Sequence, residues 1–118
     1  MAVQTLPLDC DLVVYTGTNF RREFRWLPDG VTPIDFTGWA CTMYIGTPGA
    51  AAQIVLTDTN GGIILSTVGQ LIITLDPFQT ASIRPGVTFY NLDLTAPDGY
   101  IRRFLRGRVS IVQDVQAP

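Results

Sequence analysis

Apolar and polar residues alternate most regularly between residues 87 and 112, in two arms separated by a short turn. Apolar side chains recur at every second position of the first arm, at Tyr90, Leu92 and Leu94. In the second arm they recur mostly between arginines, at Ile101, Leu105, Val109 and Ile111. A period of two residues predicts strands with one buried face. Between the arms, Pro97, Asp98 and Gly99 favour a chain reversal, so the segment is predicted to be a β-hairpin.

Six shorter segments show the same kind of strand pattern, and they span residues 11–15, 20–27, 39–45, 53–57, 63–66 and 70–75. Within 20–27, three aromatic residues fall on one face with Arg22, and such a face is predicted to pack into the core. Trp39 begins the apolar face of 39–45 and is predicted to fill the core in the same way. Between the segments lie turn-forming residues, among them Pro28-Asp29-Gly30, which has the same composition as the hairpin turn.

One short helix is predicted near residues 77–83. Asp76 is a suitable N-cap, and Pro77 suits the first helical turn because its missing N–H would have no helical partner there. Arg84-Pro85-Gly86 ends the helix after about two turns. We expect this helix to carry the chain from one sheet to another.

Seven to eight short strands with turn signals between them predict an all-β fold, a two-sheet antiparallel β-sandwich of immunoglobulin-like architecture. A small closed barrel is the alternative. The spacing of cysteine, tryptophan and cysteine that marks immunoglobulin domains is absent, so the likeness is one of architecture. We divide the chain into an N-terminal arm (residues 1–9), a β-sandwich domain (10–113) and a C-terminal tail (114–118).

The balance of charges argues against two classes of partner. The net charge is −2, and all eight positive charges are arginine. Because phosphate binding needs a clear positive excess on one surface, no nucleic-acid partner is expected. No apolar run approaches the roughly 20 residues needed to cross a bilayer, so no membrane partner is expected either. The first ten residues also lack the basic start and apolar centre of a signal peptide.

The residue types that carry most catalysis are scarce. The chain has no histidine and only two cysteines, Cys10 and Cys41, which excludes zinc and thioredoxin-type chemistry on ligand count. We expect two buried free thiols, although a disulfide would form if the fold brought them together. Three aspartate pairs could in form serve as acid and base, Asp9 with Asp11, Asp29 with Asp35, and Asp93 with Asp98. All lie in or beside turns, where aspartate commonly bonds to the backbone, so no catalytic residue is assigned.

Metal and cofactor sites are not expected either. Asp58 and Asn60 could hold calcium, but their segment lacks the acidic density and distal glutamate of a calcium loop and is predicted to be a plain turn. The glycine-containing turns match no phosphate-binding motif, so no cofactor is expected.

The second hairpin arm carries half of the positive charge of the chain. Strict alternation places Arg102, Phe104, Arg106 and Arg108 on the face opposite the core, and Arg103 on the core side near the tip of the hairpin. This outward face fits a solvated surface whose charges oppose edge-to-edge aggregation. It also fits a docking surface, because arginine beside an aromatic ring is a common interface composition.

Several short turn and strand sequences are spread along nearly the whole chain. They are Thr16-Gly17-Thr18-Asn19-Phe20, Pro28-Asp29-Gly30, Ile34-Asp35-Phe36-Thr37-Gly38-Trp39, Gly61-Gly62-Ile63, Tyr90-Asn91-Leu92-Asp93-Leu94-Thr95, Asp98-Gly99 and Arg106-Gly107-Arg108-Val109. Together they resemble small virion proteins of tailed bacteriophages, and the nearest type is the N-terminal domain of phage upper-baseplate and fibre-anchoring proteins.

The resemblance implies a non-enzymatic structural protein of the virion, an assembly or adaptor component of the tail, baseplate or neck. Its partners would be other virion proteins and copies of itself, and it would reside in particles assembled in the host cytoplasm. On this basis we expect one contact face, composed of Arg21, Arg25, Arg102, Phe104, Arg106 and Arg108. Two alternatives remain. One is a decoration protein on the capsid exterior, and the other is a carbohydrate-binding module, which would need Trp26, Trp39 or Tyr44 to be exposed.

Overall fold

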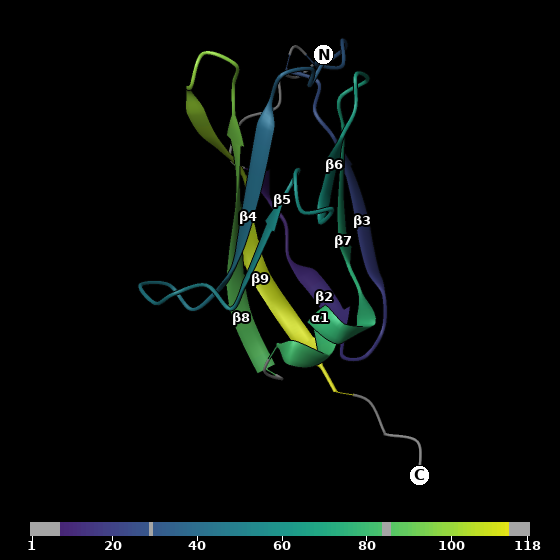
Figure 1. Cartoon of the computed structure of the whole chain (residues 1–118), viewed down its shortest axis with the longest axis vertical. Helices are drawn as coiled ribbons and strands as arrows, with labels where there is room; N and C mark the ends of the chain where they lie inside the picture. The colour runs from purple at the N-terminus through teal and green to yellow at the C-terminus, as the bar shows by residue number, and fades with distance from the viewer. Residues whose placement is uncertain (1–7, 29, 84–85, 114–118) are drawn as a thin grey trace.

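The computed structural model describes residues 8–28, 30–83 and 86–113, which form nine strands and one short helix (Figure 1). In chain order the elements are β1 (Leu8–Asp9), β2 (Leu12–Tyr15), β3 (Phe20–Arg25), β4 (Ala40–Gly46), β5 (Ile54–Thr57), β6 (Ile63–Leu65), β7 (Gln70–Leu75), α1 (Pro77–Ser82), β8 (Gly86–Thr95) and β9 (Ile101–Val112). The prediction of an all-β fold with two sheets is confirmed. No helix of the described residues is long and apolar enough to span a membrane.

The larger sheet has six strands and is built around the predicted hairpin. Its order is β1-β9-β8-β4-β5, with β2 also paired to β9, and it curls around the core (Figure 1). β8 and β9 pair antiparallel, as predicted. At the turn, the Gly99 N–H donates to the Ala96 carbonyl oxygen at 2.9 Å, and Asp98 Oδ1 accepts from the Tyr100 N–H at 2.9 Å. Gly99 has φ 90°, the conformation that glycine adopts readily.

The smaller sheet has the order β3-β7-β6, and its apolar side faces the larger sheet across the core. Strand β7 alternates as predicted, with Leu71, Ile73 and Leu75 buried and the residues between them partly exposed. From the larger sheet, buried side chains such as Met43 and Leu92 complete the core. Burial of this apolar surface is the main force that holds the two sheets together. Neither sheet closes on itself, so the closed barrel considered from the sequence is not formed.

Helix α1 begins at the predicted residue and ends one residue before the predicted end. Asp76 Oδ1 accepts from the Gln79 N–H at 2.7 Å, and the Gln79 side chain accepts from the Asp76 N–H at 3.0 Å, so the cap is reciprocal. The buried Thr80 hydroxyl lies 2.8 Å from the Thr18 carbonyl oxygen, which ties the helix to the turn between β2 and β3. The helix carries the chain from β7 in the smaller sheet to β8 in the larger one.

The N-terminal strands differ from the prediction, because β1 and β2 pair parallel to β9. The prediction of a wholly antiparallel arrangement is therefore wrong at this edge. Residues 8 and 9, which were assigned to an N-terminal arm, belong to the larger sheet. The rest of that arm, and the predicted tail at residues 114–118, lie outside the described residues.

Four aromatic rings form a cluster that joins the two sheets. The ring centroid of Trp26 lies 6.2 Å from that of Phe36, 5.9 Å from that of Trp39 and 5.7 Å from that of Phe104. Edge-to-face and offset contacts of this kind add to the free energy of area burial. Trp26 is 4% exposed, and Trp39 is partly buried against the core, as the sequence predicts for both.

Candidate binding face

The larger sheet carries exposed apolar side chains on the side that faces away from the core. Each is next to a buried residue in its own strand, and successive side chains of a strand point to opposite sides of the sheet, so they point outward. We call this surface the outer face, and its large apolar residues are Val13, Tyr15, Tyr44, Val55, Val87 and Phe89. Exposed apolar residues that cluster on one side of a sheet often mark an interaction surface.

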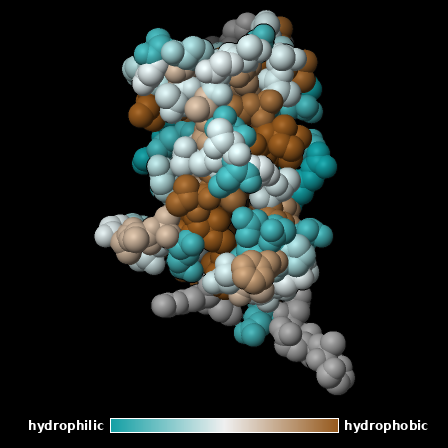
Figure 2. Space-filling view, viewed as in Figure 1, coloured by the Kyte–Doolittle hydropathy of each residue, from teal (hydrophilic) through white to brown (hydrophobic). Residues whose placement is uncertain are grey.

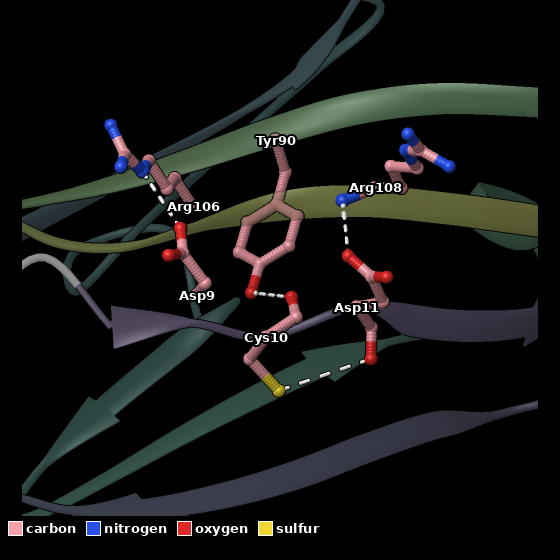
Figure 3. Close-up of polar contacts among 6 residues, drawn as sticks. All are labelled: Asp9, Cys10, Asp11, Tyr90, Arg106 and Arg108. Atoms are coloured by element: carbon pink, nitrogen blue, oxygen red, sulfur yellow. Dashed lines mark hydrogen bonds and ion pairs between the residues drawn. The ribbon is translucent and has the colours of Figure 1, made fainter.

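Charged residues of β1, β8 and β9 share the outer face with these apolar side chains. The Arg106 Nε donates to Asp9 Oδ1 at 2.8 Å, and both side chains are largely exposed (Figure 3). Arg103 makes a similar pair with Asp93 at 3.0 Å, and this hydrogen bond raises the pKa of the Arg103 guanidinium. Pairs of exposed charges of this kind add little to the free energy of folding.

Arg108 differs from the other two arginines. Its backbone N–H donates to Asp11 Oδ1 at 3.0 Å (Figure 3). Among the described residues, its guanidinium makes no ion pair. Within the described part of the chain, this exposed guanidinium next to Phe89, its cross-strand neighbour, has donors that a partner protein could use.

Phe104 does not lie on the outer face, and the prediction that placed it there is wrong. Its side chain is 0% exposed and packs on Trp26. The cause is a bulge, since Leu92 pairs with Leu105 while Asp93 pairs with Arg103, which leaves Phe104 as the extra residue. A bulge breaks strict alternation, so residues on its two sides no longer share one register.

The bulge also exchanges the sides of the strand on which the two preceding arginines lie. Arg103 was predicted to lie on the core side, but it faces outward to Asp93. Arg102 was predicted to face outward, but it pairs opposite the buried Leu94 and lies over the end of the aromatic cluster. Its guanidinium carbon is 5.7 Å from the centroid of the Trp26 ring and 5.2 Å from that of Tyr100. Arg102 therefore covers one end of the core.

The six predicted contact residues do not form one surface. Arg21 and Arg25 lie on β3 in the smaller sheet, where their cross-strand neighbours are the outward Thr74 and Gln70. That surface faces away from the outer face, on the far side of the core. Only Arg106 and Arg108 of the predicted set lie on the outer face, and their role in binding a partner stays a prediction.

Cys10 and Asp11, which connect β1 and β2, run alongside β9 at close range (Figure 3). The Tyr90 hydroxyl donates to the Cys10 carbonyl oxygen at 2.5 Å, and burial raises the pKa of this phenol. A Cβ atom on Gly107 would collide with the Cys10 carbonyl group. The absence of a side chain at Gly107 thus allows the N-terminal strands to remain beside β9, which places Asp9 and Asp11 on the rim of the outer face.

Two open depressions mark the outer face beside the loop that joins β4 and β5. One, of about 410 Å³, lies between that loop and the side chains of Tyr44, Phe89 and Asn91. The other, of about 690 Å³, is continuous with it at Phe89 and Asn91 and extends to Arg106 and Arg108. The loop projects away from the sheet (Figure 1), and its small residues give it pale colours in Figure 2. The outer face is therefore hollowed beside a protruding loop.

The residues that were considered for catalysis or metal binding from the sequence make ordinary structural contacts. Both cysteines are free; Cys41 is buried, whereas Cys10 is only partly so. Burial, with the charges of Asp58 and Asp93, raises the pKa of Cys41, so its thiol stays protonated at neutral pH. The described residues contain no group of three or more histidine, cysteine or acidic side chains placed to hold a metal ion.

The side chains that were considered as an acid, a base or a calcium ligand accept hydrogen bonds from the protein itself. Asp35 accepts from the Thr37 hydroxyl at 2.6 Å and from its N–H at 2.9 Å, which lowers the pKa of Asp35. Asp58 accepts from the Cys41 N–H at 3.0 Å. In the predicted turn, Asn60 Oδ1 accepts from the Gly62 N–H at 3.0 Å. Asp29 lies outside the described residues.

Sequence reasoning considered an exposed Tyr44 only for the carbohydrate-binding alternative and missed Phe89, although a signal was present for both. Tyr44 falls between Met43 and Ile45, and Phe89 precedes Tyr90, so both occupy the polar side of predicted strands. A large aromatic residue at such a position indicates an exposed ring. The contribution of Asp9 carried no local signal, because its partner is remote in the sequence.

Comparisons with protein-family models and with curated proteins gave no match to this chain.

Proposed function

We propose that the chain is a non-enzymatic structural protein of a tailed-bacteriophage virion, an assembly or adaptor component of the tail, baseplate or neck. The observation that carries the proposal is the outer face, where exposed aromatic and aliphatic side chains lie beside arginines on one sheet. Protein interfaces are enriched in aromatic residues and arginine. The assignment to a phage virion rests on the short turn and strand sequences that resemble those of phage virion proteins.

We also propose an immunoglobulin-like sandwich as the architecture, and the strand order supports it. In immunoglobulin domains strands B, E and D share one sheet, and strands C, F and G share the other. Here β3, β7 and β6 have the first order, while β4, β8 and β9 have the second. β5 lies beside β4 as the extra strand of variable-type domains lies beside strand C.

In this proposal the chain resides in the virion, after assembly in the host cytoplasm, and contacts other virion proteins and copies of itself. Such a role accounts for a surface with few charges, since faces buried against neighbours need no hydration. It requires neither cofactor nor metal.

Incorporation into particles tests the proposal. We expect the wild-type chain to co-purify with phage particles through a density gradient, and a variant with Phe89→Glu and Arg108→Glu to be lost from them. The matched control carries Ile64→Glu and Glu23→Arg on the smaller sheet, where both residues are exposed. Absence of the wild-type chain from purified particles would contradict the proposal.

Copy number in the same particles separates the adaptor role from capsid decoration. A decoration protein is present in hundreds of copies, and a tail component in a few to some tens. The carbohydrate-binding alternative retains only Tyr44 as an exposed ring, because Trp26 is buried and Trp39 is partly buried.

A further inference from the structure

The apolar part of the outer face is large for a surface left in water. Half of the large hydrophobic residues that are exposed in the described chain lie on it. Phe89 and Tyr44, each 41% exposed, are near its centre, with Val55 to one side and Val87 to the other. Burying these side chains against a partner would be favourable at about 25 cal/mol for each Å² of apolar area.

The charges of the outer face balance each other. Three arginines, Arg103, Arg106 and Arg108, stand beside three aspartates, Asp9, Asp11 and Asp93. A face with no net charge gives no long-range attraction to a strongly acidic or basic partner. The same interspersed pattern is complementary to itself, since a two-fold rotation can bring arginines of one copy opposite aspartates of the other.

The size of the face sets an upper limit on the interface between two copies. Strand β8 has ten residues, which corresponds to a length of about 33 Å. Five strand positions at a spacing of about 4.8 Å span roughly 24 Å, so the projected area of the face is at most about 800 Å². The curl of the sheet reduces the part of this area that a second copy can touch. An interface of standard size buries about 800 Å² on each partner.

From these three observations we propose that two copies of the chain pack through their outer faces, about a two-fold axis close to Phe89. The inference rests on the proposed function, because it names a second copy as the occupant of the same face. Each protruding loop between β4 and β5 then lies against the depression of the other copy, where Asn91 and Arg108 are available. Small side chains at Gly49, Ala50 and Ala51 let that loop approach the partner closely.

Analytical ultracentrifugation of the isolated chain tests this pairing. We expect a concentration-dependent dimer for the wild type. Phe89→Glu should weaken dimerisation at least about thirty-fold, because it places a charge at the apolar centre. Arg108→Glu should weaken it about tenfold, and this effect should shrink at high salt, where charge interactions are screened.

Matched controls lie on the other sheet. Ile64→Glu changes an apolar residue of β6 that is 51% exposed, and Glu23→Arg reverses an exposed charge of β3. Both should leave the dimerisation constant within about threefold of the wild-type value. Circular dichroism melting curves confirm that each variant is folded.

Two results would overturn the pairing. One is a wild-type chain that stays monomeric at all accessible concentrations, and the other is equal loss of dimer in the control variants. A monomer that still enters phage particles would remove the pairing and leave the proposed function standing. A dimer that is absent from particles would leave the pairing standing and contradict the proposed function.

Discussion

Phe104 is the residue of β9 at which the alternation of buried and exposed side chains is interrupted. It is the extra residue of the bulge, and its ring is fully buried in contact with Trp26. Without the bulge, this ring would point to solvent and Arg103 would point to the core, where a buried charge is costly. The bulge therefore converts an apparent surface aromatic into a core residue.

Replacement of this ring measures its contribution to the core. We expect Phe104→Ala to lower the free energy of unfolding by about 3 to 5 kcal/mol, because it leaves a cavity beside Trp26. Phe78→Ala is the matched control, since Phe78 on α1 is 84% exposed and its loss should change stability by less than about 0.5 kcal/mol. Urea denaturation followed by tryptophan fluorescence gives both values. Equal values for the two variants would contradict the assignment of Phe104 to the core.

At the scale of elements, the attachment of β1 and β2 to β9 depends on Gly107. A methyl group there would meet the backbone of Cys10, so the N-terminal strands would have to move away. We expect Gly107→Ala to destabilise the chain by about 1 to 3 kcal/mol. The amide protons of residues 12–15 should then exchange with solvent faster, which hydrogen-exchange mass spectrometry detects.

A small change on the same strand serves as the control for Gly107→Ala. Ser110 pairs opposite Val13, and Ser110→Ala adds no atom that could displace β2. Its exchange pattern should match the wild-type pattern. Unchanged exchange of residues 12–15 in Gly107→Ala would show that the close approach is not needed.

The cap of α1 offers a second test at this scale. Asp76→Ala removes both the acceptor of the Gln79 N–H and the reciprocal geometry, and should cost about 1 kcal/mol. Asp76→Asn keeps an acceptor at the same position and should cost less. The difference between the two midpoints of thermal unfolding separates the loss of the cap from a general effect of substitution.

The sequence predicts the elements whose causes are local. The hairpin and the helix follow from neighbouring residues, such as Asp98 with Gly99 and Asp76 with Pro77, and both are confirmed. The parallel pairing of β2 with β9 could not be predicted, because it joins the two ends of the described chain. Much of the outer face follows from alternation, whereas the outward turn of Arg103 required knowledge of the bulge.

At the scale of the whole molecule, stability should fall at alkaline pH. Burial raises the pKa of Cys41 from an ordinary value of 9.0 and that of Tyr90 from 10.0. The folded chain therefore retains protons that the unfolded chain releases, so the stabilisation is fully present below pH 9 and is lost as pH rises above it. Each group lowers the free energy of unfolding by up to about 1.4 kcal/mol per pH unit in this range.

Urea unfolding between pH 7 and pH 11 checks this slope, and Tyr90→Phe isolates one contribution. The variant should be less stable than wild type at pH 7, because it loses the hydrogen bond to Cys10. Its stability should nevertheless fall less steeply above pH 10, since one titrating group is gone. Parallel curves for the two proteins would exclude Tyr90 as a source of the alkaline slope.

The parallel pairing of β2 with β9 determines how the molecule responds to tension. If residues 8 and 113 are pulled apart along the strands, the hydrogen bonds between β2 and β9 lie across the direction of force and are loaded together in shear. Rupture then requires several bonds to break at once, whereas a hairpin pulled open from its end loses them one by one. A chain built in this way transmits mechanical load between its two ends with little extension.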